Sequence, residues 1–173
     1  MRIAEYSGGD LRNAIPRESF ATIVVPSIKK AQFEKFMKGY EKMYVAEFKE
    51  VDPDIKLIFK VADEPAKVMN EADQYRIIRG VFVCPNGVQR MSASMPGVVE
   101  TSNNLSIVRI GNGKFEAFCL CRSSVESAKE ATAWKIAAGF QLAGCEVELS
   151  GSYPGWKPDM NSAILSAMND TYN

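Results

Sequence analysis

The chain has 173 residues, which is enough for one domain with a sizeable core. Its 21 Lys and Arg residues equal its 21 Asp and Glu residues, so no overall positive field attracts nucleic acid or an anionic membrane surface. Histidine is absent, which removes the commonest metal ligand and the commonest general base. Hydrolytic chemistry by this chain alone is therefore not expected.

The first third of the chain predicts two strands, a helix and a third strand. Residues 1–6 and residues 20–25 form the first two strands, the second of which is rich in β-branched side chains. Ser27 is expected to cap a helix that ends before Asp52, and residues 55–61 alternate as a strand. The helix carries an apolar stripe of Phe33, Phe36, Met37, Tyr40, Tyr44 and Phe48.

Two further helices are predicted on either side of a β-hairpin. Asp63 is expected to cap a helix over residues 65–82. After the hairpin, Ser123 opens a capping-box pattern for a helix that ends at the C-cap glycine Gly144. Its buried face consists mainly of small residues and can lie close on a sheet.

Residues 97–122 form the hairpin, and a short strand at residues 88–91 leads into it. Asn112 and Gly113 at its centre are the strongest short-range hairpin signal. Placing them in the turn predicts four cross-strand pairs, and the charge complementarity of one of them supports the register. The predicted pairs are Ile110 with Phe115, Arg109 with Glu116, Ile107 with Phe118, and Leu105 with Leu120.

Arg122 then lies at the far end of the hairpin, opposite Asn103 and beside Asn104. A guanidinium next to amides at a strand end is suited to binding a carboxylate. A solvated arginine that merely closes the strand is an equally good interpretation of the sequence.

The four cysteines indicate a reducing compartment. Cys119 and Cys121 alternate on one predicted strand, so their side chains point the same way, which is poor disulfide geometry and not a zinc spacing. We interpret these two, with Cys84 and Cys145, as small buried apolar residues. No signal peptide opens the chain and no apolar run could cross a bilayer, so we expect a cytoplasmic protein without a membrane partner.

The chain closes with a strand at residues 145–149, a rigid loop at 151–158 and a short helix at 162–172. The two halves then share one order of elements: strand, turn, strand, helix, strand. We therefore predict an α+β fold of two side-by-side ferredoxin-like β-α-β-β-α-β half-units, with antiparallel sheets covered by helices and the first half-unit truncated.

Four motifs occur in order at residues 12–18, 85–88, 97–104 and 153–158: RNAIPRE, PNGV, GVVETSNN and YPGWKP. With these motifs the chain resembles the aminoacyl-histidine dipeptidases (Xaa-His dipeptidase, peptidase D) of zinc peptidase family M20. The resemblance covers nearly the whole chain. It implies an inserted lid domain at residues 1–152, with half-units at about 1–61 and 65–152. Residues 153–173 would return towards the catalytic domain.

The resemblance implies two substrate-binding residues and no metal site. Asn13 matches a lid asparagine that contacts the bound dipeptide, and Arg122 matches a lid arginine that binds its C-terminal carboxylate. By itself the sequence makes Asn13 only a turn residue that caps its own backbone. Zinc would be held by a catalytic domain whose His, Asp and Glu motifs this chain lacks, so the chain alone would be inactive.

Two functions remain open from the sequence. The first is the lid of a zinc dipeptidase that hydrolyses Xaa-His and related dipeptides, with the dipeptide and its own catalytic domain as partners. The second is a non-catalytic ferredoxin-like dimerisation or binding module. Because residues 1–5 lack the leading strand and helix of their half-unit, we also expect an unpaired edge that favours a homodimer.

Overall fold

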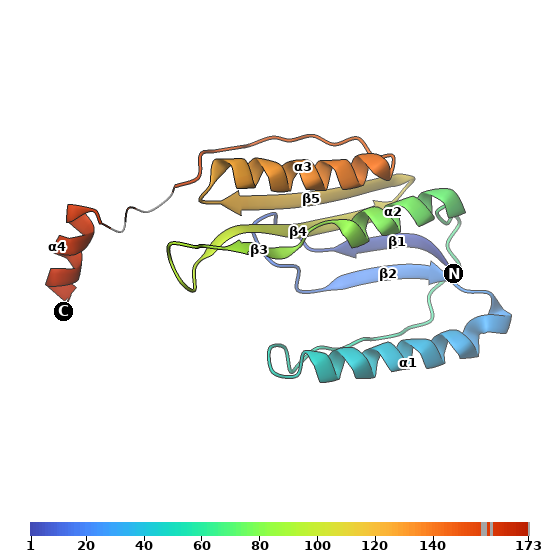
Figure 1. The fold of residues 1–173 in the computed structure, drawn as a ribbon. Helices are drawn as coiled ribbons and strands as arrows, with labels where there is room; N and C mark the ends of the chain where they lie inside the picture. Colours follow the sequence, from blue (N-terminus) through green and yellow to red (C-terminus); the bar gives the residue numbers. More distant parts are fainter. Residues whose placement is uncertain (157–158, 160, 173) are drawn as a thin grey trace.

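The computed structural model describes residues 1–156, 159 and 161–172. A single five-stranded antiparallel sheet carries helices on one face, while α1 and α4 stand apart from it (Figure 1). The elements in order are β1 (Arg2–Gly8), β2 (Ser19–Val24), the 3-10 helix η1 (Ser27–Lys29), α1 (Lys30–Glu47), α2 (Glu71–Val83), β3 (Gly87–Met91), β4 (Val99–Gly111), β5 (Lys114–Ser123), α3 (Glu126–Leu142) and α4 (Ala163–Tyr172).

β4 is the central strand of the sheet. Its first residues pair with β3 and its last residues pair with β1, while β5 runs antiparallel along its other side. β2 continues the sheet beyond β1. The α+β class and the antiparallel arrangement predicted from the sequence are confirmed, although the pairing of β1 with β4 joins both halves of the chain into one sheet.

The hairpin of β4 and β5 forms around Asn112 and Gly113, whose φ angles are 52° and 76°. Two positive φ angles in a two-residue loop match the right-handed twist of the strands, which is why Asn-Gly is favoured there. Three predicted pairs are confirmed: Ile110 with Phe115, Arg109 with Glu116, and Ile107 with Phe118.

The fourth predicted pair is wrong because a bulge interrupts β4 between Leu105 and Ile107. Ser106 occupies the bulge, is fully buried and donates its hydroxyl to the Phe118 carbonyl at 2.9 Å. The extra residue shifts the register, so Leu105 pairs with Cys119. Arg122 in turn lies opposite Ser102 and not opposite Asn103.

The core lies between the sheet and the helices α2 and α3. Ile136 and Phe140 of α3 pack with Cys84 at the end of α2. Partly buried side chains of β5 complete the cluster, and the rings of Phe115 and Phe140 are 5.9 Å apart. The small-residue face predicted for α3 thus lets it lie directly over β5.

Residues 55–61 and 145–149 are not strands, contrary to the prediction. Residues 55–58 do alternate in burial as predicted, but a strand also needs a paired neighbour, and no described strand hydrogen-bonds to either segment. The outer edge of β5 consequently carries no partner strand among the described residues. Each half of the chain therefore lacks the last strand that was predicted for it.

Three helix starts also differ from the prediction. α2 begins at Glu71 because Asn70 caps it, accepting a hydrogen bond from the Asp73 amide at 2.9 Å. Ser27 lies in η1 and makes no capping bond to α1. The Ser123 hydroxyl accepts from the Val125 amide at 3.0 Å, so it closes a turn and does not cap α3.

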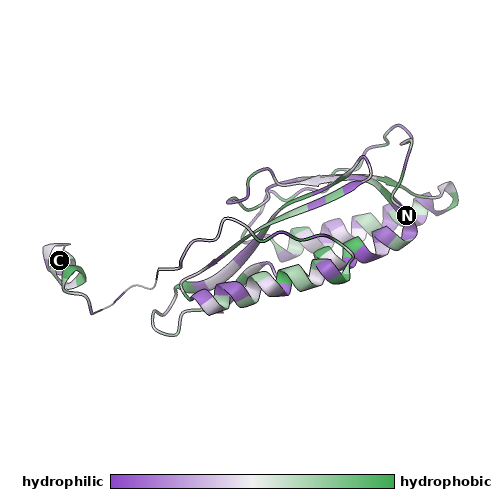
Figure 2. Ribbon diagram, turned by 90° about the horizontal axis from the view of Figure 1, so that it is seen from above, coloured by the Kyte–Doolittle hydropathy of each residue, from purple (hydrophilic) through white to green (hydrophobic). Residues whose placement is uncertain are grey.

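The aromatic stripe of α1 forms but is not covered. Phe36, Tyr40, Tyr44 and Phe48 stack along the helix with successive ring centroids 4.7, 5.9 and 6.2 Å apart. No residue of α1 is buried, and the helix lies away from the sheet (Figure 1). Figure 2 shows hydrophilic and hydrophobic residues interspersed along the helices. No described helix is long and apolar enough to cross a membrane.

Replacing Gly113 tests the hairpin turn. Gly113→Ala should lower the free energy of unfolding by about 1 kcal/mol, because an L-residue is disfavoured at a left-handed φ. The measurement is urea unfolding followed by circular dichroism. Gly111→Ala is the control, since an added Cβ meets nothing within 4 Å at either glycine and only Gly113 has a positive φ. Equal losses in both variants would contradict the assigned turn.

Candidate functional site

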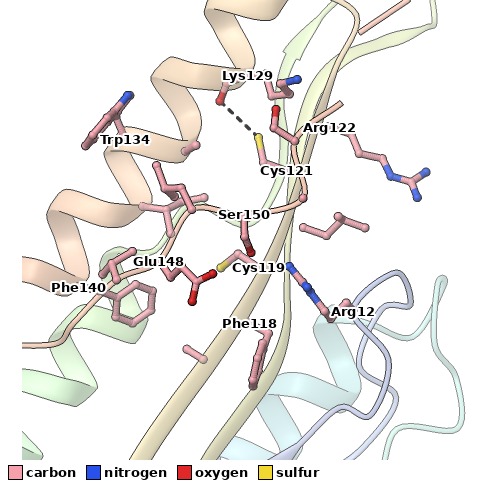
Figure 3. Close-up of a pocket in the computed structure, with 18 of the residues that line it drawn as sticks. Arg12, Phe118, Cys119, Cys121, Arg122, Lys129, Trp134, Phe140, Glu148 and Ser150 are labelled. Carbon is pink, nitrogen blue, oxygen red and sulfur yellow. Dashed lines mark hydrogen bonds between the residues drawn. The ribbon is translucent and has the colours of Figure 1, made fainter. Parts of the chain in front are cut away.

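Arg122 projects from the open face of the sheet near the end of β5. Side chains alternate along a strand, so Arg122 shares its face with Phe118 and Leu120, while Cys119 and Cys121 face α3. Figure 3 shows Arg122 pointing away from α3 and its residues Trp134 and Phe140. The side chain is exposed, and no carboxylate among the described residues forms an ion pair with it.

A second guanidinium lies on the same side of β5. Arg12 belongs to the irregular segment between β1 and β2, and Figure 3 shows it on the side that Arg122 occupies. Arg12, Asn13 and Arg122 all line one cavity of about 1590 Å³ beside β5. The two predicted site residues and Arg12 thus line the same large cavity. The charge next to Asn13 in the sequence is the signal that could have indicated Arg12.

Asn104 holds the segment that carries Asn13. Its side-chain amide donates to the Ala14 carbonyl at 2.7 Å across 90 residues of sequence. Gly9 brings the start of this segment against β4, because a Cβ at Gly9 would lie only 1.8 Å from the Ser106 carbonyl oxygen. Asn104 pairs with Leu120, so its side chain lies on the face of the sheet that carries Leu120 and Arg122. The two contacts therefore hold the Asn13 segment on that face.

The PNGV motif is joined to the same stretch of β4. The Asn103 side chain donates to the Pro85 carbonyl at 2.6 Å, and the Asn86 side chain accepts from the Leu105 amide at 2.9 Å. Adjacent asparagines of β4 therefore anchor two different motifs on opposite faces of the sheet. The RNAIPRE and PNGV motifs are far apart in the sequence, and these bonds bring both to one stretch of β4.

Glu100 is a structural residue and not a partner of Arg122. Its carboxylate pairs with Arg90 of β3 and also accepts from the Thr101 hydroxyl at 3.2 Å. The carboxylate is 13% exposed, so this pair closes the β3–β4 edge and leaves Arg122 available. The role of Glu100 could not be predicted from the sequence, because its pairing with Arg90 depends on the bulged register between β3 and β4.

Polar contacts hold the loop that follows residue 150 against α3. Glu126 accepts from the Gly155 amide at 3.3 Å and pairs with Lys129, which also donates to the Tyr153 carbonyl. These bonds hold the loop against the start of α3. Trp156 is 79% exposed, and Lys157 and Pro158 lie outside the described residues.

The cysteines are free thiols; Cys84 is buried as predicted, whereas Cys119, Cys121 and Cys145 are only partly buried. Cys84 and Cys119 approach within 3.8 Å, Sγ to Sγ. The hydrogen bond with Cys84, assisted by Asn103 and the charge of Arg12, lowers the pKa of Cys119. The hydrogen bond with Cys119 and burial raise the pKa of Cys84, while burial raises the pKa values of Cys121 and Cys145.

Among the residues that the structure describes, no three His, Cys, Asp or Glu side chains are grouped to hold a metal ion. The cavity lining includes the guanidinium groups of Arg12 and Arg122 and the Asn13 amide, together with several Asp and Glu carboxylates. A guanidinium with a neighbouring amide is suited to binding an anion with planar oxygens, such as a carboxylate.

Comparison with known proteins shows that the chain is similar to dipeptidases. The chain is 37% identical over 174 aligned residues to the cytosol non-specific dipeptidase of Escherichia coli (strain K12). It also matches the crystal structure of aminoacylhistidine dipeptidase from Vibrio alginolyticus with a TM-score of 0.93 and 37% identity. No model of a protein family matches the chain.

The alignments cover 99% of this chain but only 36% and 35% of the two relatives. The chain therefore spans about a third of the length of the relatives it matches. The resemblance to aminoacyl-histidine dipeptidases is confirmed, and the fold is that of one portion of such a protein.

Removing the Asn104 amide tests how the Asn13 segment is held. Asn104→Ala should lower the free energy of unfolding by about 1 kcal/mol through the lost hydrogen bond to Ala14. It should also speed tryptic cleavage after Arg12 and Arg17, which flank the contact, without speeding cleavage after Arg109. Unchanged cleavage after Arg12 and Arg17, measured by mass spectrometry, would show that the segment is held by other contacts.

Proposed function

We propose that this chain is the lid of a dipeptidase of the M20 type and that it binds the C-terminal carboxylate of the dipeptide substrate. The observation that carries the proposal is the position of Arg122, exposed and without a carboxylate partner among the described residues, on the cavity wall that also includes Asn13. The similarity to two dipeptidases over nearly the whole chain supplies the substrate class.

The residues of this chain orient the substrate and do not cleave it. The planar guanidinium of Arg122 presents two parallel N–H donors to the carboxylate, and the Asn13 amide hydrogen-bonds the dipeptide near its scissile bond. Arg12 adds positive charge to the same wall and strengthens the attraction. Closure of the lid over the bound dipeptide excludes water and fixes the scissile bond for the catalytic groups.

Zinc is the cofactor of this function in the complete enzyme. The described residues of this chain do not provide its ligand set, so every step assigned to the chain is one of binding, orientation or exclusion of water. Xaa-His and related dipeptides in the cytoplasm are the proposed substrates. The name of the E. coli relative, a cytosol enzyme, supports the location.

In this proposal residues 1–152 form the lid, with half-units at about 1–61 and 65–152, and residues 153–173 lead back to the catalytic domain. The β1–β4 pairing is the junction between the half-units. Through it Asn13 of the first half-unit and Arg122 of the second reach one cavity.

A non-catalytic dimerisation module is the second candidate. The unpaired outer edge of β5 among the described residues and the uncovered aromatic stripe of α1 favour it, because both are surfaces that a second copy can cover. Light scattering of the purified chain tests the dimerisation candidate. A dimer supports self-association, and a monomer at high concentration speaks against it.

Replacing Arg122 in the complete enzyme tests carboxylate binding. Arg122→Lys keeps the charge but loses the bidentate fork, which should cost about 2–4 kcal/mol, or roughly 30- to 1000-fold in kcat/KM. Dipeptide amides that lack the free carboxylate should lose little. Arg109→Lys is the matched control, because Arg109 is exposed on the same sheet beside the hairpin turn. Equal losses on both substrates would make Arg122 structural.

The chain by itself should neither retain zinc nor hydrolyse dipeptides. Metal analysis after dialysis and an Xaa-His hydrolysis assay with added zinc are the measurements. The reason is the lack of a ligand set among the described residues. Zinc-dependent cleavage by the purified chain, at a rate that follows the protein through chromatography, would overturn this part of the proposal.

A further inference from the structure

Two thiols from distant parts of the chain meet at the boundary between α2 and β5. Cys84 follows the last residue of α2, and Cys119 lies in the middle of β5, 35 residues later. Their sulfur atoms are 3.8 Å apart, which is van der Waals contact, and a disulfide would bring them to about 2.05 Å. Neither residue has a role in the proposed substrate binding.

The two thiols have different environments. Cys84 is 9% exposed and belongs to the core cluster with Ile136 and Phe140. Cys119 is partly exposed and is part of the cavity lining. Figure 3 shows Cys119 with Arg12 nearby.

We infer that Cys84 and Cys119 form a reversible disulfide when the protein meets a small disulfide such as oxidised glutathione. Cys119 is the attacking residue and Cys84 the resolving one. The accessible position of Cys119 and the buried position of Cys84 set this order.

The lowered pKa of Cys119 agrees with that order, because the thiolate is the nucleophile in thiol–disulfide exchange. The hydrogen bond with Cys84 is the largest cause, and Asn103 and the charge of Arg12 add to it. The pKa of Cys84 is raised, which agrees with its later place in the order.

The exchange takes two balanced steps. The Cys119 thiolate attacks one sulfur of oxidised glutathione, the reagent's S–S bond breaks, and one glutathione thiolate leaves. Cys84 then gives up its proton to solvent and attacks the Cys119 sulfur, and the second glutathione leaves as a thiolate that takes up a proton. Two protein thiols are oxidised and one glutathione disulfide is reduced to two glutathione thiols.

The bond would join α2 to the strand that carries Arg122. A cross-link that closes a long loop restricts the unfolded chain, so oxidation should raise the urea midpoint of unfolding. Cys121 and Cys145 provide matched controls: Cys121 lies on the same face of β5 as Cys119, and Cys145 packs against the same core cluster.

The test treats the full 173-residue chain with oxidised glutathione and measures intact mass, followed by non-reducing peptide mapping. The expected product has lost two hydrogens, links Cys84 to Cys119 and unfolds at higher urea than the reduced chain. The double variant Cys121→Ser, Cys145→Ser should behave identically, whereas Cys84→Ser should retain one glutathione on Cys119. In concentrated urea the Cys84–Cys119 link should lose its preference over the other cysteine pairings.

Three results would overturn the inference. One is a stable glutathione adduct on Cys119 of the unmodified sequence, because it would show that Cys84 cannot reach it. Another is a bridge that contains Cys121 or Cys145. The third is the persistence of four free thiols under conditions that oxidise the unfolded chain.

Discussion

The backbone pairing of β4 is the interaction on which the rest of the structure depends. This strand alone contacts β1, β3 and β5, so it joins the two halves of the chain and places their loops on common faces. Its bulge at Ser106 shifts the register towards β5, and the buried hydroxyl of that residue satisfies the Phe118 carbonyl that the bulge frees. The position of Arg122 opposite Ser102 follows directly from this shift.

Two asparagine side chains of β4 hold neighbouring segments in place beside the candidate site. Asn104 binds the segment of Asn13 on one face of the sheet, and Asn103 binds the PNGV motif on the other. Each side-chain amide donates a hydrogen bond to a backbone carbonyl that has no partner strand in the sheet. Ala14 and Pro85, which lie outside the helices and strands on either side of β4, therefore have defined positions.

The parts of the fold that depend on local chemistry were predictable from the sequence. Asn112 and Gly113 specify the turn by their backbone preferences, and the alternation after them specifies three of the pairs. The bulge was not predictable, because Ser106 is an ordinary strand residue until its hydroxyl finds a buried carbonyl. Residues 55–61 show the opposite case: their alternation is that of a strand, but pairing depends on a neighbour that the local sequence does not specify.

In the candidate site, too, some residues were predictable from local chemistry and others depend on long-range contacts. The chemistry of Arg122 at a strand end indicated carboxylate binding, whereas Asn13 came only from resemblance to a family. Arg12, Asn104 and the Cys84–Cys119 contact were missed because each depends on residues tens of positions away in the chain. Long-range contacts of this kind follow from the register of β4 and from the packing of α2 on the sheet.

The central claim is that Arg122 receives the carboxylate of a dipeptide. A crystal structure of the complete enzyme with a non-hydrolysable dipeptide analogue tests it most directly. The account predicts that both carboxylate oxygens lie about 2.7–2.9 Å from nitrogens of the Arg122 guanidinium, with the Asn13 amide directed at the dipeptide near its scissile bond. A bound analogue whose carboxylate contacts other residues while Arg122 faces solvent would contradict the account.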